Sequence, residues 1–202
     1  MASVSKWSQL VAHLEMDWEV TAHQRRTYYE VLQLRREECT TLLDAGCGIG
    51  FDVSRLLELG YEYTGIDLTP EMLARARERN PSVTFEQADI TKRIPFPDES
   101  FDLVVSHDVL IHVDDFTAAL DEMWRVAKKA MVIRLAYTTA LGNKRACDIN
   151  RNVLNIWRNW SYVSHNLYQL VPPPAGVNLY MVKPDEMVVD SYEGQIFEVR
   201  RG

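Results

Sequence analysis

Five short apolar segments alternate with amphipathic segments along the middle of the chain, and this alternation limits the possible folds more than any other feature. The apolar segments have the length and composition of buried strands, whereas the intervening segments have helical spacing. Strands are predicted at residues 40–44, 61–67, 82–89, 101–107 and 130–137. Strands that alternate with helices form parallel sheets that are covered on both faces. The pattern therefore predicts an α/β fold.

A glycine-rich turn lies where the first predicted strand leads into a helix. Gly46, Gly48 and Gly50 alternate in "DAGCGIG". Glycine permits positive φ and lets a ligand approach the backbone closely. Asp67 ends the next predicted strand, where an acidic side chain can accept both hydroxyls of a ribose. The pattern favours a nucleotide-type ligand over the alternative, a plain tight turn with a helix-capping Asp67.

The spacing of the turn separates classes of nucleotide ligand. The dinucleotide fingerprint G-x-G-x-x-G needs a third glycine for close packing of helix and strand. Counted from Gly46 and Gly48, that position is Phe51. The chain also has no G-K-[ST] for a phosphate-cradling loop. The spacing therefore disfavours NAD, FAD and P-loop nucleotides as the ligand of this turn.

Four ordered stretches then carry a resemblance to a known family. "LLDAGCGIG", "GIDLTPEML", "QADI" and "FDLVVSHDVLIHV" resemble the four successive motifs of class I S-adenosylmethionine-dependent methyltransferases, with family-like spacing. The similarity is greatest to the branch that includes quinone-biosynthesis methyltransferases. It implies S-adenosylmethionine as cofactor and S-adenosylhomocysteine as its product.

The resemblance also implies a fold and its boundaries. We expect a three-layer, Rossmann-like, seven-stranded mixed sheet, with an antiparallel strand from a C-terminal hairpin joined around Glu193–Gly194. The 202 residues are expected to form a single methyltransferase domain. Its parts are an N-terminal helical lid at 1–39, a cofactor-binding core at 40–137, a variable substrate or lid segment at 138–185 and the hairpin at 186–202.

By this resemblance, one group of residues lines the methionine end of the cofactor. The group is Asp44, Gly46, Cys47, Gly48 and the region of His107. The cofactor's ammonium needs an anion or carbonyls, and its carboxylate needs donors. Cys47 is interpreted as a small residue beside the cofactor rather than a nucleophile, because no histidine near it in sequence supports a thiolate.

A second group is expected at the nucleoside end. Asp67 would hold the ribose, with Leu68 against the adenine face. Asp89 would accept a hydrogen bond from the adenine amino group, and Ile90 would border the ring. Met72 has two interpretations, a contact near the adenine and a plain core position. The alternative for Asp89 is a solvated loop carboxylate.

Candidate catalytic residues follow the fourth predicted strand. Transfer of a methyl group from a sulfonium needs mainly alignment, and a base is required only when the acceptor must lose a proton. His107 is a candidate base because histidine titrates near neutrality; the alternative is that it only packs against the cofactor. His112 is the second candidate, more often structural in this context. The histidines and carboxylates show no metal-ligand spacing, so no metal is expected.

The acceptor pocket is expected in the aromatic regions that flank the core motifs. Tyr28 and Tyr137 are candidate substrate contacts from these regions. Arg134 interrupts the apolar fifth strand, and it could either form a salt bridge or bind an anionic substrate. The alternative for the aromatic residues is that they fill the core.

Composition limits the partners. The net charge is -7, which argues against nucleic acid as a partner. The three cysteines form no C-x-x-C pair, and no apolar run has the length to cross a bilayer. We therefore expect a cytoplasmic protein without a membrane partner. The oligomeric state is not predicted.

The predicted function is transfer of a methyl group from S-adenosylmethionine to a small-molecule acceptor, with an O, N or C acceptor unresolved. Three alternatives stay open: a protein or peptide methyltransferase, a catalytically inactive S-adenosylmethionine-binding partner protein, and an NAD-binding module.

Overall fold

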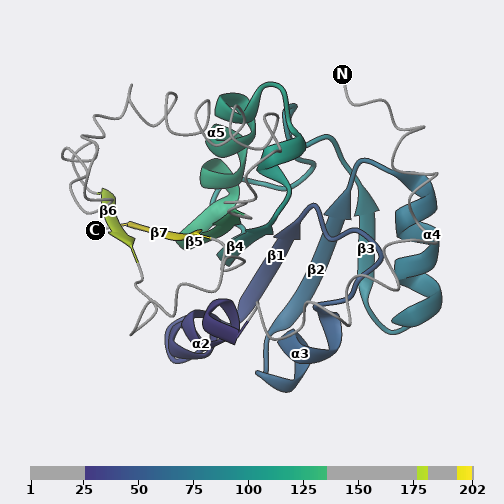
Figure 1. The fold of residues 1–202 in the computed structure, drawn as a ribbon, viewed down its shortest axis with the longest axis horizontal. Helices are drawn as coiled ribbons and strands as arrows, with labels where there is room; N and C mark the ends of the chain where they lie inside the picture. The colour runs from purple at the N-terminus through teal and green to yellow at the C-terminus, as the bar shows by residue number, and fades with distance from the viewer. Residues whose placement is uncertain (1–25, 136–176, 182–194, 202) are drawn as a thin grey trace, which may run out of the picture.

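The chain forms one mixed sheet with helices packed on both faces (Figure 1). The computed structural model describes residues 26–135, 177–181 and 195–201. The strand order is β3-β2-β1-β4-β5-β7-β6. The strands are β1 Thr41–Ala45, β2 Glu62–Asp67, β3 Thr84–Gln87, β4 Phe101–His107, β5 Ala127–Leu135, β6 Val177–Met181 and β7 Gln195–Arg201. The helices are α2 Arg26–Arg35, α3 Val53–Glu58, α4 Pro70–Arg79 and α5 Phe116–Val126, with the short 3-10 helix η2 Leu110–His112.

The sheet corrects the predicted fold class. The strands that carry the sequence motifs, β1 to β5, form a five-stranded, all-parallel core, and the antiparallel strands β7 and β6 extend the sheet beyond β5. The prediction that both strands of the hairpin lie within 186–202 is also wrong. β7 does run antiparallel to β5, but its second antiparallel neighbour is β6 at Val177–Met181, inside the segment predicted as variable. The Glu193–Gly194 turn signal suggested a tight hairpin, whereas the two paired strands are separated by residues 182–194.

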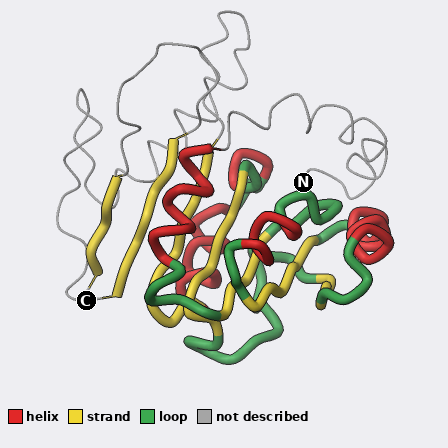
Figure 2. The backbone as a smooth tube through the Cα atoms, turned by 90° about the horizontal axis from the view of Figure 1, so that it is seen from below, coloured by secondary structure: helices red, strands yellow, loops and turns green. Residues whose placement is uncertain are grey.

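Side chains of the central strands are buried on both faces of the sheet, so the core has two parts. On one face, α5 packs Ala119 and Met123 against Val104 of β4. On the other face, α2, α3 and α4 pack over residues such as Leu103. Successive side chains of a strand point to opposite faces, so neighbours along β4 serve different layers. The strands run side by side as a single layer (Figure 2), which gives the predicted three-layer arrangement.

The described helices begin and end in different ways. Asp115 caps α5, and its carboxylate accepts a hydrogen bond from the Ala118 backbone N–H at 3.1 Å. Thr69 precedes Pro70 at the start of α4, but its hydroxyl makes no capping bond. Gly60 has φ +91° directly after the end of α3, the left-handed conformation expected of a glycine that ends a helix.

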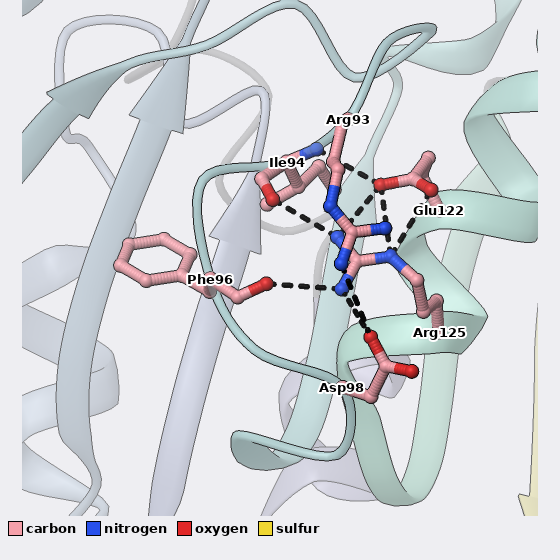
Figure 3. Close-up of polar contacts among 6 residues, drawn as sticks. All are labelled: Arg93, Ile94, Phe96, Asp98, Glu122 and Arg125. Carbon is pink, nitrogen blue, oxygen red and sulfur yellow. Dashed lines mark hydrogen bonds and ion pairs between the residues drawn. The ribbon is translucent and has the colours of Figure 1, made fainter.

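Arg125 of α5 fixes the loop that follows β3 (Figure 3). Its guanidinium donates to the Phe96 and Ile94 carbonyls, both at 2.9 Å, and forms ion pairs with Glu122 and Asp98. Glu122 accepts in turn from the Ile94 backbone N–H at 2.9 Å. The hydrogen bond from Arg125 is the main cause that holds the pKa of Glu122 below its usual value. Burial acts against it and raises the pKa. The loop leaving the carboxyl end of β3 is therefore anchored to α5.

Candidate active site

The glycine turn joins the ends of β1 and β2. The backbone N–H groups of Gly46 and Cys47 both donate to the Ile66 carbonyl, at 2.8 and 2.9 Å. Gly46 and Gly48 have φ +94° and +54°, in the region that favours glycine. A Cβ on Gly46 would lie 2.3 Å from a methyl group of Val109, whereas a Cβ on Gly48 would have no atom within 4 Å. Gly46 is thus fixed by packing, and Gly48 leaves open space.

This open space belongs to a cleft at the carboxyl ends of β1 and β4. The cleft holds about 440 Å³ of space, including its solvent-open mouth. Its lining is Asp44, Gly46, Cys47, Gly48, Ile49, Phe51, Asp52 and His107. The structure therefore brings together the five residues that the sequence assigned to the methionine end. Ligands of open α/β sheets bind at this edge.

Asp44 lies one residue before the end of β1 and lines the cleft. Its carboxylate accepts a hydrogen bond from the Tyr63 hydroxyl at 2.8 Å. Burial raises the pKa of Asp44 to about 8, the nearby charge of Asp52 adds to the rise, and the Tyr63 bond opposes it. A cationic group in the cleft would favour the ionised form of Asp44. Tyr63 was not anticipated from the sequence, because its pattern is that of an ordinary strand residue.

Asp67 lies on the other side of the turn, at the end of β2. One carboxylate oxygen accepts from the Gly48 backbone N–H at 3.0 Å and the other from Thr69 N–H at 2.8 Å. Burial raises the pKa of Asp67, partly offset by these backbone bonds. Leu68 follows with 38% of its surface exposed, which is unusual for a leucine between a strand and a helix.

The remaining predicted nucleoside-end residues lie near the ends of β2 and β3 but do not line the cleft. Met72 on α4 and Ile90 after β3 are both buried apolar residues, and Ile90 packs in the core beneath α5. Asp89 accepts from the Thr91 backbone N–H at 3.0 Å and pairs with Lys92. Burial alone would raise the pKa of Asp89, but the bonds to Thr91 and Lys92 outweigh it and lower it.

His107 ends β4 and forms one wall of the cleft. Its Nδ1 lies 2.7 Å from a carboxylate oxygen of Asp52, and both side chains are almost fully buried. The other oxygen of Asp52 accepts from the hydroxyl of Tyr29 on α2. The ring of Tyr28 packs on the His107 ring at 4.6 Å between centroids. Asp52 and Tyr29 were not predicted as site residues.

Asp108 and Arg134 continue this cluster across the sheet. Arg134 is the β5 partner of His107 in the strand register and is buried, and its guanidinium donates to the Asp108 carboxylate. The Asp108 backbone has φ +58°, an uncommon conformation for a residue other than glycine. Strained backbone of this kind is concentrated at functional sites.

Tyr28 presents the one buried hydroxyl of this cluster that has no hydrogen-bond partner among the described residues. Burial, with the charges of Asp44 and Asp52, holds the pKa of Tyr28 well above its usual value, so the hydroxyl stays protonated. Two other predicted residues are not placed at the cleft. His112 is exposed at the end of η2, and Tyr137 lies outside the described residues, as do most of the aromatic residues expected to form a lid.

The cleft's cysteine and the rest of the described chain suggest no other reactive centre. Burial raises the pKa of the Cys47 thiol well above its usual value, which opposes a thiolate nucleophile. Across residues 26–135, 177–181 and 195–201, no group of three or more histidine, cysteine or acidic side chains is arranged to hold a metal ion. In the same residues, no helix has the length and apolar character needed to cross a membrane.

Comparison with known proteins identifies the domain. Residues 43–133 match the model of the family described as "Methyltransferase domain". The chain is 39% identical to a malonyl-[acyl-carrier protein] O-methyltransferase of Serratia marcescens over 102 residues, and 40% identical to a 2-methyl-6-phytyl-1,4-hydroquinone methyltransferase of Synechocystis over 122 residues. This part of the chain is a class I S-adenosylmethionine-dependent methyltransferase domain. The matches cover 50% and 58% of this chain, and 39% and 36% of those relatives' lengths.

Solved structures agree with the fold of the methyltransferase domain. A putative S-adenosylmethionine-dependent methyltransferase of Methanococcus maripaludis has a TM-score of 0.67 at 16% identity, over 96% of this chain and 93% of that one. The magnesium protoporphyrin IX methyltransferase of Synechocystis, solved with bound S-adenosylmethionine, has a TM-score of 0.54 at 17% identity, over 89% and 80%. At these identities the likeness shows the fold alone.

Proposed function

We propose that this methyltransferase domain transfers a methyl group from S-adenosylmethionine to a small-molecule acceptor. The observation that carries the proposal is the open face of Gly48, which lies between the carboxylates of Asp44 and Asp67 at the carboxyl edge of the sheet. S-adenosylmethionine has a cationic amino-acid end and a ribose. One carboxylate can bind each of these groups, and a backbone turn without a side chain lets the cofactor come close between them.

The methionine end of the cofactor is proposed to lie along Asp44, Gly46, Cys47, Gly48 and His107. The residues present fit this group because Asp44 is held largely protonated by burial near neutral pH, so a sulfonium and an ammonium beside it would compensate its ionised form. The space in front of Gly48 would accept a ligand where any side chain would intrude.

The nucleoside end is proposed to lie over Asp67, Leu68 and Asp89, with Met72 and Ile90 supporting it from the core. Exposed Leu68 offers an apolar surface to the adenine ring. Asp67 already accepts two backbone N–H bonds, but a carboxylate has further acceptor sites for the ribose hydroxyls.

When bound, S-adenosylmethionine supplies a methyl group already activated by its sulfonium, so the chain's residues mainly align the acceptor and exclude water. We propose His107 as the residue that accepts a proton where the acceptor must lose one. Tyr28, Arg134 and Tyr137 are proposed around the acceptor. The exposed His112 is assigned no step.

A small molecule is proposed as the acceptor, in line with the names of two relatives. Two relatives are named for methylation of a hydroquinone and of malonyl-[acyl-carrier protein], and this chain spans under half the length of each. The proposals of a cytoplasmic location and of no nucleic-acid partner rest on cysteine usage and net charge.

A transfer assay with methyl-labelled S-adenosylmethionine tests the function. The full chain is incubated with panels of phenols, hydroquinones, carboxylic acids and amines, in parallel with a Gly48→Val variant. Labelling of at least one acceptor by the wild type, lost with Gly48→Val, is expected. Binding of the cofactor without labelling of any acceptor would favour the inactive partner protein, and labelling of added peptides alone would favour a protein methyltransferase.

A further inference from the structure

The carboxylate of Asp52 does not serve the role that its position suggests. Asp52 directly precedes α3, where an aspartate usually accepts a hydrogen bond from the first turn of the helix. In the structure its side chain makes no capping bond. It instead binds His107 Nδ1 at 2.7 Å and the Tyr29 hydroxyl. Three separate elements, α2, the start of α3 and the end of β4, therefore meet at this carboxylate.

These contacts determine which nitrogen of His107 carries a proton. Both oxygens of Asp52 are positioned to accept hydrogen bonds, one from Tyr29 and one from the histidine ring. An ionised carboxylate can only accept, so the neutral ring carries its proton on Nδ1 and a lone pair on Nε2. The Tyr28 ring, packed on the imidazole at 4.6 Å, restricts rotation of the ring.

The second ring nitrogen of His107 lies near another carboxylate. Nε2 is 3.6 Å from a carboxylate oxygen of Asp108, which Arg134 also contacts. The ring therefore lies between two carboxylates, Asp52 at Nδ1 and Asp108 near Nε2.

We infer that Asp52 is a positioning residue that makes His107 a general base, and that the acceptor is a neutral O–H compound of the phenol, hydroquinone or enol class. This inference rests on the proposed function. Methylation of a carboxylate needs no such base near neutral pH, whereas a phenol gains most when its proton is removed as the new bond forms. A carboxylate held in place by three elements and hydrogen-bonded to the ring suits an acceptor that must lose a proton.

In the proposed step, the proton of the acceptor hydroxyl passes to His107 Nε2. A lone pair of the acceptor oxygen forms the new O–CH₃ bond, while the pair of the broken C–S bond stays on sulfur and gives S-adenosylhomocysteine. The proton then leaves Nε2 for solvent after the product departs.

The first test measures the tautomer of His107 without any acceptor. Nitrogen-15 NMR of histidine-labelled full chain, assigned with a His107→Gln variant, is compared for wild type, Asp52→Asn and a surface control, Asp121→Asn. We expect a proton on Nδ1 in wild type and control, and a shift toward the Nε2–H form in Asp52→Asn, whose amide can donate. An Nε2–H ring in the wild type, or no change in Asp52→Asn, would overturn the inference.

The second test compares acceptors of different acidity. Asp52→Asn is expected to lower kcat about a hundredfold for phenol and hydroquinone, within the range of general base catalysis. It should lower kcat less than fivefold for 4-nitrophenol, which is already ionised at pH 8. Equal losses for both, or wild-type turnover of amines and carboxylic acids alone, would overturn the inference. The labelling assay separates the two claims, because failure of the proposed function leaves every acceptor unlabelled by the wild type, whereas failure of this inference alone leaves the wild type active with the outcomes just named.

Discussion

The two halves of the sheet's carboxyl edge, the cleft on one side of the glycine turn and the ends of β2 and β3 on the other, hold their carboxylates in different ways. In the β1–β4 half, defined by Asp44, Asp52 and Asp108, the partners are side chains from distant parts of the sequence: Tyr63, His107 with Tyr29, and Arg134. In the β2–β3 half, defined by Asp67 and Asp89, each carboxylate accepts from the backbone N–H two residues further along the chain, and the other partners are the Gly48 backbone N–H and nearby side chains of Thr91 and Lys92.

The difference indicates separate tasks for the two halves. Locally bonded carboxylates keep their position with little help from the rest of the fold, as suits fixed acceptors for an uncharged ligand. The buried cluster of the β1–β4 half depends on α2, the start of α3 and four strands at once, and burial raises the pKa of Asp44 to about 8. Perturbed, mutually coupled groups of this kind are typical of sites of reaction.

The turn that joins the halves should give the largest effect. Gly46→Ala places a methyl group 2.3 Å from Val109 at φ +94°, so we expect a loss of about 3 kcal/mol or more in unfolding free energy. Gly48→Ala meets no atom and should cost about 1 kcal/mol for its left-handed backbone. Chemical denaturation measures both; equal losses would contradict the assignment of packing to one glycine and open space to the other.

Removal of the main β2–β3 carboxylate should have the next largest effect. Asp67→Ala is expected to weaken S-adenosylmethionine binding more than tenfold, because charge-assisted hydrogen bonds contribute about 1.5–3 kcal/mol. Calorimetry measures the affinity, with Asp121→Ala on the exposed side of α5 as control. An affinity unchanged from wild type would argue against a ribose at Asp67.

Asp44 should make stability depend on pH in a definite direction. Its pKa is raised to about 8 in the folded chain, so between about pH 4 and pH 8 the folded state holds a proton that the unfolded state has released. Stability contributed by this group is therefore lost as pH rises, by up to about 1.4 kcal/mol per pH unit. Asp44→Asn should reduce this slope. Denaturation at pH 5, 6, 7 and 8 would contradict the account if the two proteins keep parallel slopes.

Asp89 should show a small effect of the opposite sign. Its pKa is lowered in the folded chain, so its contribution to stability is present above the unfolded value and is lost as pH falls through the folded one. Because the pair with Lys92 is exposed, Asp89→Asn should cost less than about 1 kcal/mol at pH 7 and nothing at pH 2–3. A loss that grows as the pH is lowered would contradict this sign.

Sequence reasoning located the residues that line the cleft but not the distant side chains that hold them. The glycine turn, Asp67 and the loop of Asp89 are recognisable because their hydrogen bonds close within a few residues or across adjacent strands. The sequence gives no such signal for Asp52 or Tyr29, since their partnership with His107 exists only after α2, α3 and β4 are packed together. The hairpin was predicted wrongly for a related reason. Its position was taken from a short-range turn signal, whereas the position of β7 depends on its pairing with β5 and on the core.

The most direct test of the central claim, that the carboxyl edge of the sheet binds S-adenosylmethionine across both halves, is calorimetric titration of the full chain with that cofactor and with NAD. The account predicts binding of S-adenosylmethionine with a Kd below about 1 mM, which is about 4 kcal/mol of binding free energy, and no detectable binding of NAD. Binding of NAD with neither S-adenosylmethionine nor S-adenosylhomocysteine bound would contradict it.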